Sequence, residues 1–231
     1  MPDLRLEADA VARLQASGAS ALGIAGVDEV GRGPWAGPVT GGAAWIDPEH
    51  LPEDLANALE DSKKLSVKKR DQLAARMLEA AAQDPAPLLV CTGSASVAEI
   101  DQLNILQAAF LAMARALEAL QAQLAVRRPD VRLGHVLVDG RAVPPWALPC
   151  QAVIGGDGKS LSIAAASILA KVTRDAEMAA LAQAHPGYGW ERNAGYGTAE
   201  HRKALDLLGT TPHHRRSFKP IRALSDQIGS F

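Results

Sequence analysis

The chain has 231 residues, of which 48% are hydrophobic, and its formal net charge is −2. This length can bury one sizeable core, so we expect a single domain over residues 1–231, with its core at about 22–220 and a tail at 221–231. The charge excludes binding of nucleic acid through overall basicity, so such binding would need a local basic patch.

The two cysteines, Cys91 and Cys150, have no metal-ligand spacing and cannot form a disulfide framework, which is typical of proteins in a reducing cytosol. The N-terminal segment contains acids and no long apolar run. No stretch approaches the roughly 18 to 20 apolar residues of a membrane span. We therefore expect a soluble, cytoplasmic protein, and we expect it to be a monomer.

Hydrophobic periodicity predicts an N-terminal helix at 5–17 and then a buried strand at 21–30 that ends in acids and a glycine–proline turn. A tight connection leads to the next apolar run, 39–46, which favours an antiparallel pair. After a polar loop at 47–62, we expect further strands at 88–94, 135–140 and 150–156, and helices at 66–82, 99–126, 161–184 and 198–208, before a basic tail. This order predicts an α/β fold with a mixed sheet of about five strands, flanked by helices, and a small helical C-terminal segment.

Two consecutive acids, Asp28 and Glu29, end the first predicted strand. A buried strand seldom carries such a pair, because uncompensated buried charge is costly. Neighbouring strand residues point to opposite faces, so we expect the chain to leave regular strand geometry here, which Gly31 and Gly33 would permit. The alternative is a solvated pair of acids at the end of a strand.

Two further acids stand at informative positions. Asp139 ends the apolar run VLVDG, and sites of α/β sheets gather at the carboxyl ends of strands, although a plain Asp-Gly turn is the alternative. Asp175 lies on a predicted helix, where pairing with Lys171 one turn earlier is the alternative. Converging carboxylates repel one another unless cations neutralise them, and an all-oxygen donor set favours Mg²⁺ or Mn²⁺ over zinc.

The motif DEVGRGPWAGPV at 28–39 resembles the ribonuclease HII family. The resemblance continues, in family order, through DSKKLS (61–66), VDG (138–140), GDGKSLSIAAASILAKVTRD (156–175), GYGT (195–198) and HHRRSF (213–218). These blocks span roughly residues 22 to 220.

The resemblance implies a ribonuclease H-like fold and a site of four acids, which the motifs place at Asp28, Glu29, Asp139 and Asp175. It implies that Mn²⁺ or Mg²⁺, in a pair of ions, supports hydrolysis on the 5′ side of a ribonucleotide, leaving 3′-hydroxyl and 5′-phosphate ends. The substrates implied are RNA–DNA hybrids and duplex DNA that contains ribonucleotides. Asp101 matches no catalytic position, and we interpret it as a residue of a helix N-terminus.

The 2′-hydroxyl distinguishes RNA from DNA. The resemblance implies that Gly31, Arg32 and Gly33 recognise the ribonucleotide, and a glycine turn does allow close backbone approach to a sugar. Arg32 could meet a phosphate or could pair with a nearby acid. The resemblance also implies that Tyr196 stacks on the sugar beside the scissile bond; without it, a tyrosine between glycines is typical of a loop anchor.

Basic residues gather in two clusters. Lys63 and Lys64 lie in a family motif and are predicted to bind phosphates, and a second cluster comprises His213, His214, Arg215, Arg216 and Lys219. The role of His213 and His214 is left open. Residues 227–231 vaguely resemble a sliding-clamp-binding peptide, with a frayed tail as the alternative. A DNA-specific nuclease of the same fold, a non-catalytic binding module and a Mg²⁺-dependent small-molecule enzyme are the rival functions.

Overall fold

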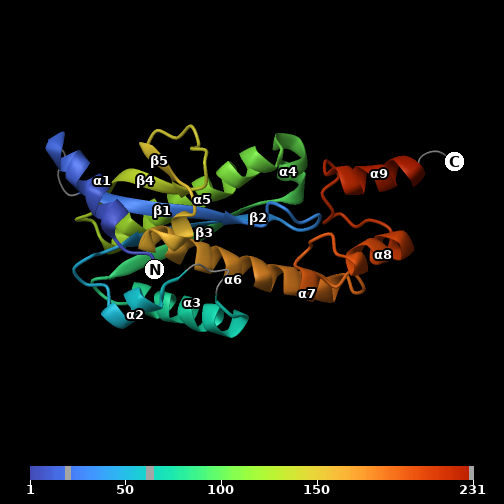
Figure 1. Ribbon diagram of the computed structural model, residues 1–231, viewed down its shortest axis with the longest axis horizontal. Coiled ribbons are helices and arrows are strands. Elements are labelled where there is room, and N and C mark those ends of the chain that lie inside the picture. Colours follow the sequence, from blue (N-terminus) through green and yellow to red (C-terminus); the bar gives the residue numbers. More distant parts are fainter. Residues whose placement is uncertain (19–21, 61–64, 229–231) are drawn as a thin grey trace.

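The computed structural model describes residues 1–18, 22–60 and 65–228, with side chains up to Leu224 (Figure 1). The predictions for Lys63 and Lys64 lie outside the described residues, as do those for the side chains of 227–231. The sheet has five strands, in the order β3-β2-β1-β4-β5. They are β1 (Leu22–Val30), β2 (Val39–Ile46), β3 (Leu88–Ala95), β4 (Arg132–Asp139) and β5 (Cys150–Val153).

The sheet is mixed, as predicted. Strand β2 lies antiparallel to both β1 and β3, whereas β1, β4 and β5 are parallel. Val27 of β1 is paired with Val138 of β4, so the next residue of each strand, Asp28 and Asp139, comes at the same edge of the sheet. The register therefore brings together two acids that are far apart in the sequence.

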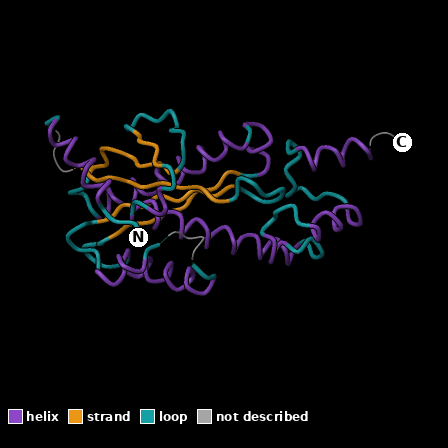
Figure 2. Tube along the Cα trace, viewed as in Figure 1, coloured by secondary structure: helices purple, strands orange, loops and turns teal. Residues whose placement is uncertain are grey.

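Helices flank this sheet, and others extend beyond one end of it (Figures 1 and 2). They are α1 (Arg5–Ala16), α2 (Glu53–Ala58), α3 (Val67–Ala81), α4 (Val97–Leu103), α5 (Ile105–Arg127), α6 (Leu161–Ala184), α7 (Trp190–Asn193), α8 (Ala199–Leu208) and α9 (Lys219–Ile228), with a short 3₁₀ turn at Gly156–Gly158. Helices α7, α8 and α9 form the end of the molecule on the right of Figure 1, which we call the C-terminal lobe.

Two glycines of β2 allow helices to pack closely on both faces of the sheet. A Cβ on Gly41 would lie 2.5 Å from the backbone nitrogen of Met113 in α5, and a Cβ on Gly42 would lie 2.1 Å from the carbonyl oxygen of Ala166 in α6. Because adjacent strand residues point to opposite faces, α5 and α6 cover opposite sides of the sheet. The VTGG run is therefore required by packing, since any larger side chain would push a helix away.

Several predicted segments differ in the structure. The helix expected at 99–126 is two helices, separated at Asn104, whose φ of +72° is incompatible with a continuous helix. The Asn104 side chain accepts hydrogen bonds from the backbone N–H groups of Leu106 and Gln107 and so begins α5. The segment at 47–62, which was expected to be a loop, contains α2. The strand expected at 150–156 ends at Val153.

Helix α5 is long and apolar enough to cross a membrane by length and composition alone, contrary to the expectation from sequence. A single helix of this kind is weak evidence, because the core helix of a globular protein meets the same criterion. Its buried residues include Ala112, Met113 and Leu120, and the helix packs against β2 and β3. The cytoplasmic location and the monomeric state stay predictions.

Candidate functional site

Three of the four predicted acids lie close enough to influence one another. Asp28 is only 5% exposed, and its pKa is raised well above the usual value by burial and by the charges of Glu29 and Asp139. Burial is also the main cause that raises the pKa of Glu29, and the charge of Asp139 adds to it. This mutual repulsion is what a bound cation would relieve.

The backbone places these acids in the last three residues of β1, directly before the glycine turn. Asp28 and Glu29 remain in regular register with Gly42 and Gly41 of β2, and the chain leaves the strand only at Gly31, where φ is +98°. Asp28 accepts a hydrogen bond from the N–H of Glu29 at 2.7 Å, and the hydroxyl of Ser167 on α6 also binds it. The strand predicted at 21–30 therefore ends at Val30, and the departure from strand geometry begins at Gly31, one of the two glycines expected to permit it.

The Asp139 carboxylate is held at the end of β4. Its Oδ1 accepts a hydrogen bond from the N–H of Gly156 at 2.6 Å, at the start of the 3₁₀ turn. This contact joins β4 to the segment that leads into α6. Asp139 is thus more than a simple Asp-Gly turn, because its side chain faces both the turn and the charge of Asp28.

Asp175 has a different environment. Its Oδ1 accepts a hydrogen bond from Nζ of Lys171 at 2.6 Å, and its Oδ2 lies 3.8 Å from Nη2 of Arg70. The charges that raise the pKa of Asp28 come from Glu29 and Asp139, not from Asp175. The pairing with Lys171 that the sequence offered as an alternative is therefore present.

The donor set fits a hard divalent cation. It consists of the carboxylate oxygens of Asp28, Glu29 and Asp139, whose negative charges repel one another, and it contains no sulfur or imidazole ligand. No group of three or more Asp, Glu, His or Cys side chains in the described part of the chain is arranged closely enough to hold a metal ion as it stands. The acids are thus within electrostatic range of one another, without a ready-made coordination shell.

A turn follows the two acids of β1. The guanidinium of Arg32 donates a hydrogen bond from Nη1 to the Glu29 carboxylate at 2.9 Å, and it lowers the pKa of Glu29 against the effect of burial. Arg32 and Gly33 are exposed, whereas Gly31 is buried. Of the two roles that the sequence left open for Arg32, the structure contains the ion pair with an acid.

Tyr196 lies beside this turn although it is remote in sequence. A Cβ on Gly33 would lie 3.2 Å from Cε1 of Tyr196, so the ring packs on the turn where Gly33 has no side chain. Tyr196 is 49% exposed, which leaves part of its ring open to a ligand. The structure thus brings Tyr196, the 31–33 turn and the acids of β1 to one side of the molecule.

Sequence analysis missed two residues beneath this turn, Arg174 and Arg215. Both are completely buried. The Arg215 guanidinium donates a hydrogen bond to the carbonyl of Gly31 in the turn, and the Arg174 guanidinium donates one to the carbonyl of Pro38, which follows the turn. Arg215 and His214 belong to the basic cluster that the sequence indicates at 213–219, but both side chains are buried, so neither is part of an exposed basic surface. Arg215 lies in the sequence between His214 and the exposed Arg216. A run of basic residues does not by itself show which of its members is buried.

The predicted role of Asp101 at a helix N-terminus also needs correction. Asp101 lies in the second half of α4, and its carboxylate accepts hydrogen bonds from the N–H groups of Arg216 and Ser217 and from the Ser217 hydroxyl. It ties the segment after Arg215 to the domain. Asp101 therefore has a structural role next to Arg215, whose side chain binds the carbonyls of Gly31 and Arg32.

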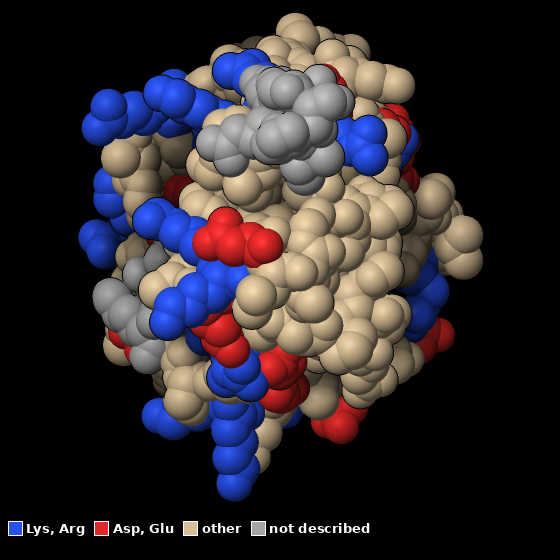
Figure 3. All heavy atoms as spheres, turned by 90° about the vertical axis from the view of Figure 1, so that its right-hand side faces the viewer, with Lys and Arg blue, Asp and Glu red and all other residues tan. Residues whose placement is uncertain are grey.

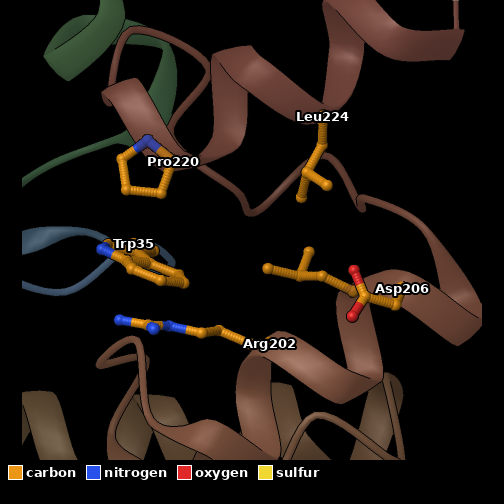
Figure 4. Close-up of a pocket in the computed structure, with 6 residues that line it drawn as sticks. Trp35, Arg202, Asp206, Pro220 and Leu224 are labelled. Carbon is orange, nitrogen blue, oxygen red and sulfur yellow. The ribbon is translucent and has the colours of Figure 1, made fainter.

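The C-terminal lobe is basic and has a small cavity. Lysine and arginine side chains gather along the left and lower edges of this end of the molecule in Figure 3, and the exposed ones in the lobe include Arg202, Lys203, Lys219 and Arg222. A cavity of about 420 Å³ lies between α8 and α9, and the Arg202 guanidinium lies 5.3 Å from the centre of the Trp35 ring. Figure 4 shows the side chains that line this cavity. Trp35 follows the 31–33 turn, but none of the four predicted site acids lines this cavity.

Comparisons with known proteins agree on one family. The ribonuclease HII family model matches residues 25–221. A ribonuclease HII of Rhodospirillum rubrum is 58% identical over 222 residues, which cover 96% of this chain and 91% of that protein.

Solved structures share the fold. Ribonuclease H2 from Pyrococcus horikoshii superposes with a TM-score of 0.68 at 26% identity, covering 91% of this chain and all of that one. Ribonuclease HII from Archaeoglobus fulgidus, solved as a complex with PCNA, gives a TM-score of 0.60 at 25% identity, covering 86% of this chain and 96% of that one. The mixed sheet flanked by helices is therefore the ribonuclease H-like fold that the sequence predicted.

Proposed function

Because this chain belongs to the ribonuclease HII family, we propose that it is an endoribonuclease that cuts the RNA strand of RNA–DNA hybrids and incises duplex DNA on the 5′ side of an embedded ribonucleotide. One observation carries the proposal. The acids that end β1 and β4 lie at the same edge of the sheet, next to a glycine turn on which Tyr196 packs. This arrangement places charge for phosphodiester hydrolysis beside groups that can contact a sugar.

In this proposal, Asp28, Glu29 and Asp139 hold a divalent cation, Mn²⁺ or Mg²⁺, and Asp175 helps to position a second. Such cations would stabilise negative charge on the attacking and leaving oxygens, giving 3′-hydroxyl and 5′-phosphate ends. In the structure, the Asp175 carboxylate forms ion pairs with the side chains of Lys171 and Arg70. A second metal ion would have to compete with these two side chains for that carboxylate. Ser167 and the N–H of Gly156 orient Asp28 and Asp139.

Sugar recognition falls to the turn and the tyrosine. The main chain of Gly31, Arg32 and Gly33 would approach the 2′-hydroxyl, and the half-exposed ring of Tyr196 would stack on the neighbouring sugar. Lys63 and Lys64 are proposed to bind phosphates of the backbone on the basis of their motif alone.

The test uses three matched duplexes: an RNA–DNA hybrid, a DNA duplex with one ribonucleotide, and the same duplex in all-DNA form. We expect cleavage of the first two, only with Mn²⁺ or Mg²⁺, and with the cut mapped to the 5′ side of the ribonucleotide. Asp28→Asn should abolish cleavage while the protein stays folded. Cleavage of the all-DNA duplex at a comparable rate would instead favour a DNA-specific nuclease of the same fold.

A second proposal concerns the tail at 227–231, as a peptide that binds a sliding clamp. It is supported by the PCNA complex of the Archaeoglobus fulgidus relative and by the weak resemblance of the sequence QIGSF. A pull-down with purified clamp should retain the full chain and lose a variant that lacks these five residues. Equal retention of both proteins would leave the tail as a frayed end.

A further inference from the structure

Arg215 gathers four backbone carbonyls around one guanidinium. Its Nη2 donates to Gly31 O at 2.6 Å and to Pro38 O at 3.0 Å, its Nη1 to Arg32 O at 3.0 Å, and its Nε to Gly37 O at 2.9 Å. The side chain has no exposed surface. The planar fork of arginine can serve several acceptors in fixed directions, which the single ammonium of lysine cannot do.

Arg174 extends this network to a second segment. Its Nε donates to Pro38 O at 3.0 Å, its Nη2 to Ala36 O at 3.3 Å, and its Nη1 to Ala194 O at 3.1 Å. Ala194 begins the loop that carries Tyr196, so Arg174 joins that loop to the turn. The fit is close, because a Cβ on Gly31 would lie 2.1 Å from Nε of Arg174.

The two arginines, which we call the arginine pair, carry their charges without a carboxylate partner within ion-pair distance among the residues described. Burial lowers the pKa of both, and the charge of Arg174 helps to lower that of Arg215 to about 9. Two like charges buried together are costly unless the surroundings compensate them. Here carbonyl dipoles supply the compensation, so the carbonyls are forced to point inward.

Inward carbonyls have a direct consequence for the N–H groups of the turn. In a trans peptide, the C=O of one residue and the N–H of the next point in opposite directions. Because Arg215 draws in the carbonyls of Gly31 and Arg32, the N–H groups of Arg32 and Gly33 face away from it. Both residues are exposed, and neither N–H donates to an acceptor in the described part of the chain.

We propose that Arg174 and Arg215 are positioning residues for ribonucleotide selectivity: they hold the 31–38 segment so that the N–H groups of Arg32 and Gly33 are presented to the sugar, with Tyr196 fixed alongside. This inference rests on the proposed function and names what sets the selectivity of that site. Neither arginine touches the nucleic acid. Their effect is to remove the freedom of a turn that contains two glycines, which would otherwise sample other orientations.

The test is Arg215→Lys, which keeps the charge and loses the fork. Two quantities are compared: KM for the duplex with one ribonucleotide, and the inhibition constant Ki of the all-DNA duplex as a competitor. Their ratio does not depend on the fraction of active enzyme. We expect kcat/KM to fall by about 10- to 100-fold, as misplacement of binding groups can cause. We expect KM to rise while Ki stays the same, so that the ratio Ki/KM falls toward one.

Three further variants complete the design. Arg174→Lys should reproduce the loss of selectivity through the Tyr196 loop. Arg132→Lys, at the exposed start of β4, should change neither constant. Leu205→Ala removes buried side chain from the same lobe without touching a carbonyl contact, so it should lower the melting temperature and leave Ki/KM unchanged. Wild-type selectivity in folded Arg215→Lys, or equal loss of selectivity in Leu205→Ala, overturns the proposal.

A measurement on the wild-type protein covers the case in which both lysine variants fail to fold. In amide NMR spectra, the Arg32 and Gly33 N–H resonances should shift with the ribonucleotide duplex and much less with the all-DNA duplex. Equal response to both duplexes overturns the inference.

If the wild-type protein does not cut the ribonucleotide duplex at all, the proposed function fails. The arginine pair is then still tested by whether these two resonances move in Arg215→Lys.

Discussion

The Nε2 atoms of His201 and His214 lie 3.0 Å apart in the interior of the C-terminal lobe. Nδ1 of His214 accepts a hydrogen bond from the N–H of Thr211 at 2.9 Å, so the proton of His214 is on Nε2 and is donated to His201. Nδ1 of His201 is then the protonated nitrogen, and it donates to the carbonyl of Tyr196 at 2.9 Å. Two neutral imidazoles thus form a series of hydrogen bonds that ends at the carbonyl of Tyr196.

This pair of buried histidines predicts a loss of stability in acid. Burial lowers the pKa of both imidazoles, and for His214 the charge of His201 and other histidines brings it to about 4. An unfolded imidazole takes up its proton near pH ~6.5, so proton uptake favours the unfolded chain between that pH and 4. The contribution of His214 to stability is therefore complete above about pH 6.5 and is lost as the pH falls through this window.

The variant His214→Gln isolates this effect. Its free energy of unfolding should depend less on pH than that of the wild type between about pH 6.5 and 4, by up to roughly 1.4 kcal/mol per pH unit. Urea denaturation at several pH values measures the difference. Parallel curves for the two proteins across the window would contradict the assignment of His214 as a buried neutral imidazole.

The buried carboxyl of Asp28 predicts the opposite pH dependence, a loss of stability as the pH rises. Burial and the charges of Glu29 and Asp139 raise the pKa of Asp28, so stability falls as the pH rises from the unfolded pKa of about 3.9 through the raised folded pKa, and the full cost is present above it. Asp28→Asn removes this cost. In EDTA at about pH 8, the variant should melt at a higher temperature than the wild type, by roughly 2 to 4 °C for each 1 kcal/mol of cost removed at this size. It should be inactive nonetheless.

Metal addition supplies the second half of this prediction. Mn²⁺ should raise the melting temperature of the wild type and have much less effect on Asp28→Asn, because the variant lacks one of the carboxylates that a cation would neutralise. Asp9→Asn, an exposed acid on α1, is the control and should match the wild type with and without Mn²⁺. Equal stabilisation of all three proteins by Mn²⁺ would place the cation elsewhere.

The sequence was sufficient where local pattern decides structure. Short apolar runs predicted all five strands and helical periodicity predicted most helices, and apolar runs that end in acids predicted the positions of Asp28 and Asp139. The break at Asn104 was missed, since its positive φ and its capping role depend on where β3 and the sheet place the chain. The strand register that aligns Asp28 with Asp139 is a tertiary property, and no local pattern contains it.

Burial of charged residues was the main limit. Arg215 and Arg216 are adjacent and chemically identical, yet one is enclosed by carbonyls and the other is exposed. A run of basic residues indicates a solvated or phosphate-binding surface on average, and only the fold shows which member turns inward. The same reason explains His214, whose partner His201 comes from another motif.

The ion pair of Arg32 with Glu29 predicts a change in pH dependence. Arg32 lowers the pKa of Glu29, so Arg32→Gln should raise that pKa. If Glu29 acts as a carboxylate, the acidic limb of the kcat/KM profile then shifts to higher pH, and activity lost at low pH is recovered at high pH. Profiles from about pH 5 to about pH 9 measure this. A uniform loss at every pH would instead assign Arg32 to a phosphate contact.

Tyr196 predicts a graded series at the ring face. Tyr196→Phe keeps the face that packs beside Gly33, and it should retain cleavage within about threefold, whereas Tyr196→Ala removes the face and should lower kcat/KM by about tenfold or more, as loss of a stacking contact does. Gly33→Ala should fall between them, because its Cβ would lie 3.2 Å from the ring and displace it slightly. Each variant is assayed on the duplex with one ribonucleotide. A loss in Tyr196→Phe as large as in Tyr196→Ala would mean that the hydroxyl, and not the ring face, makes the contact with the sugar.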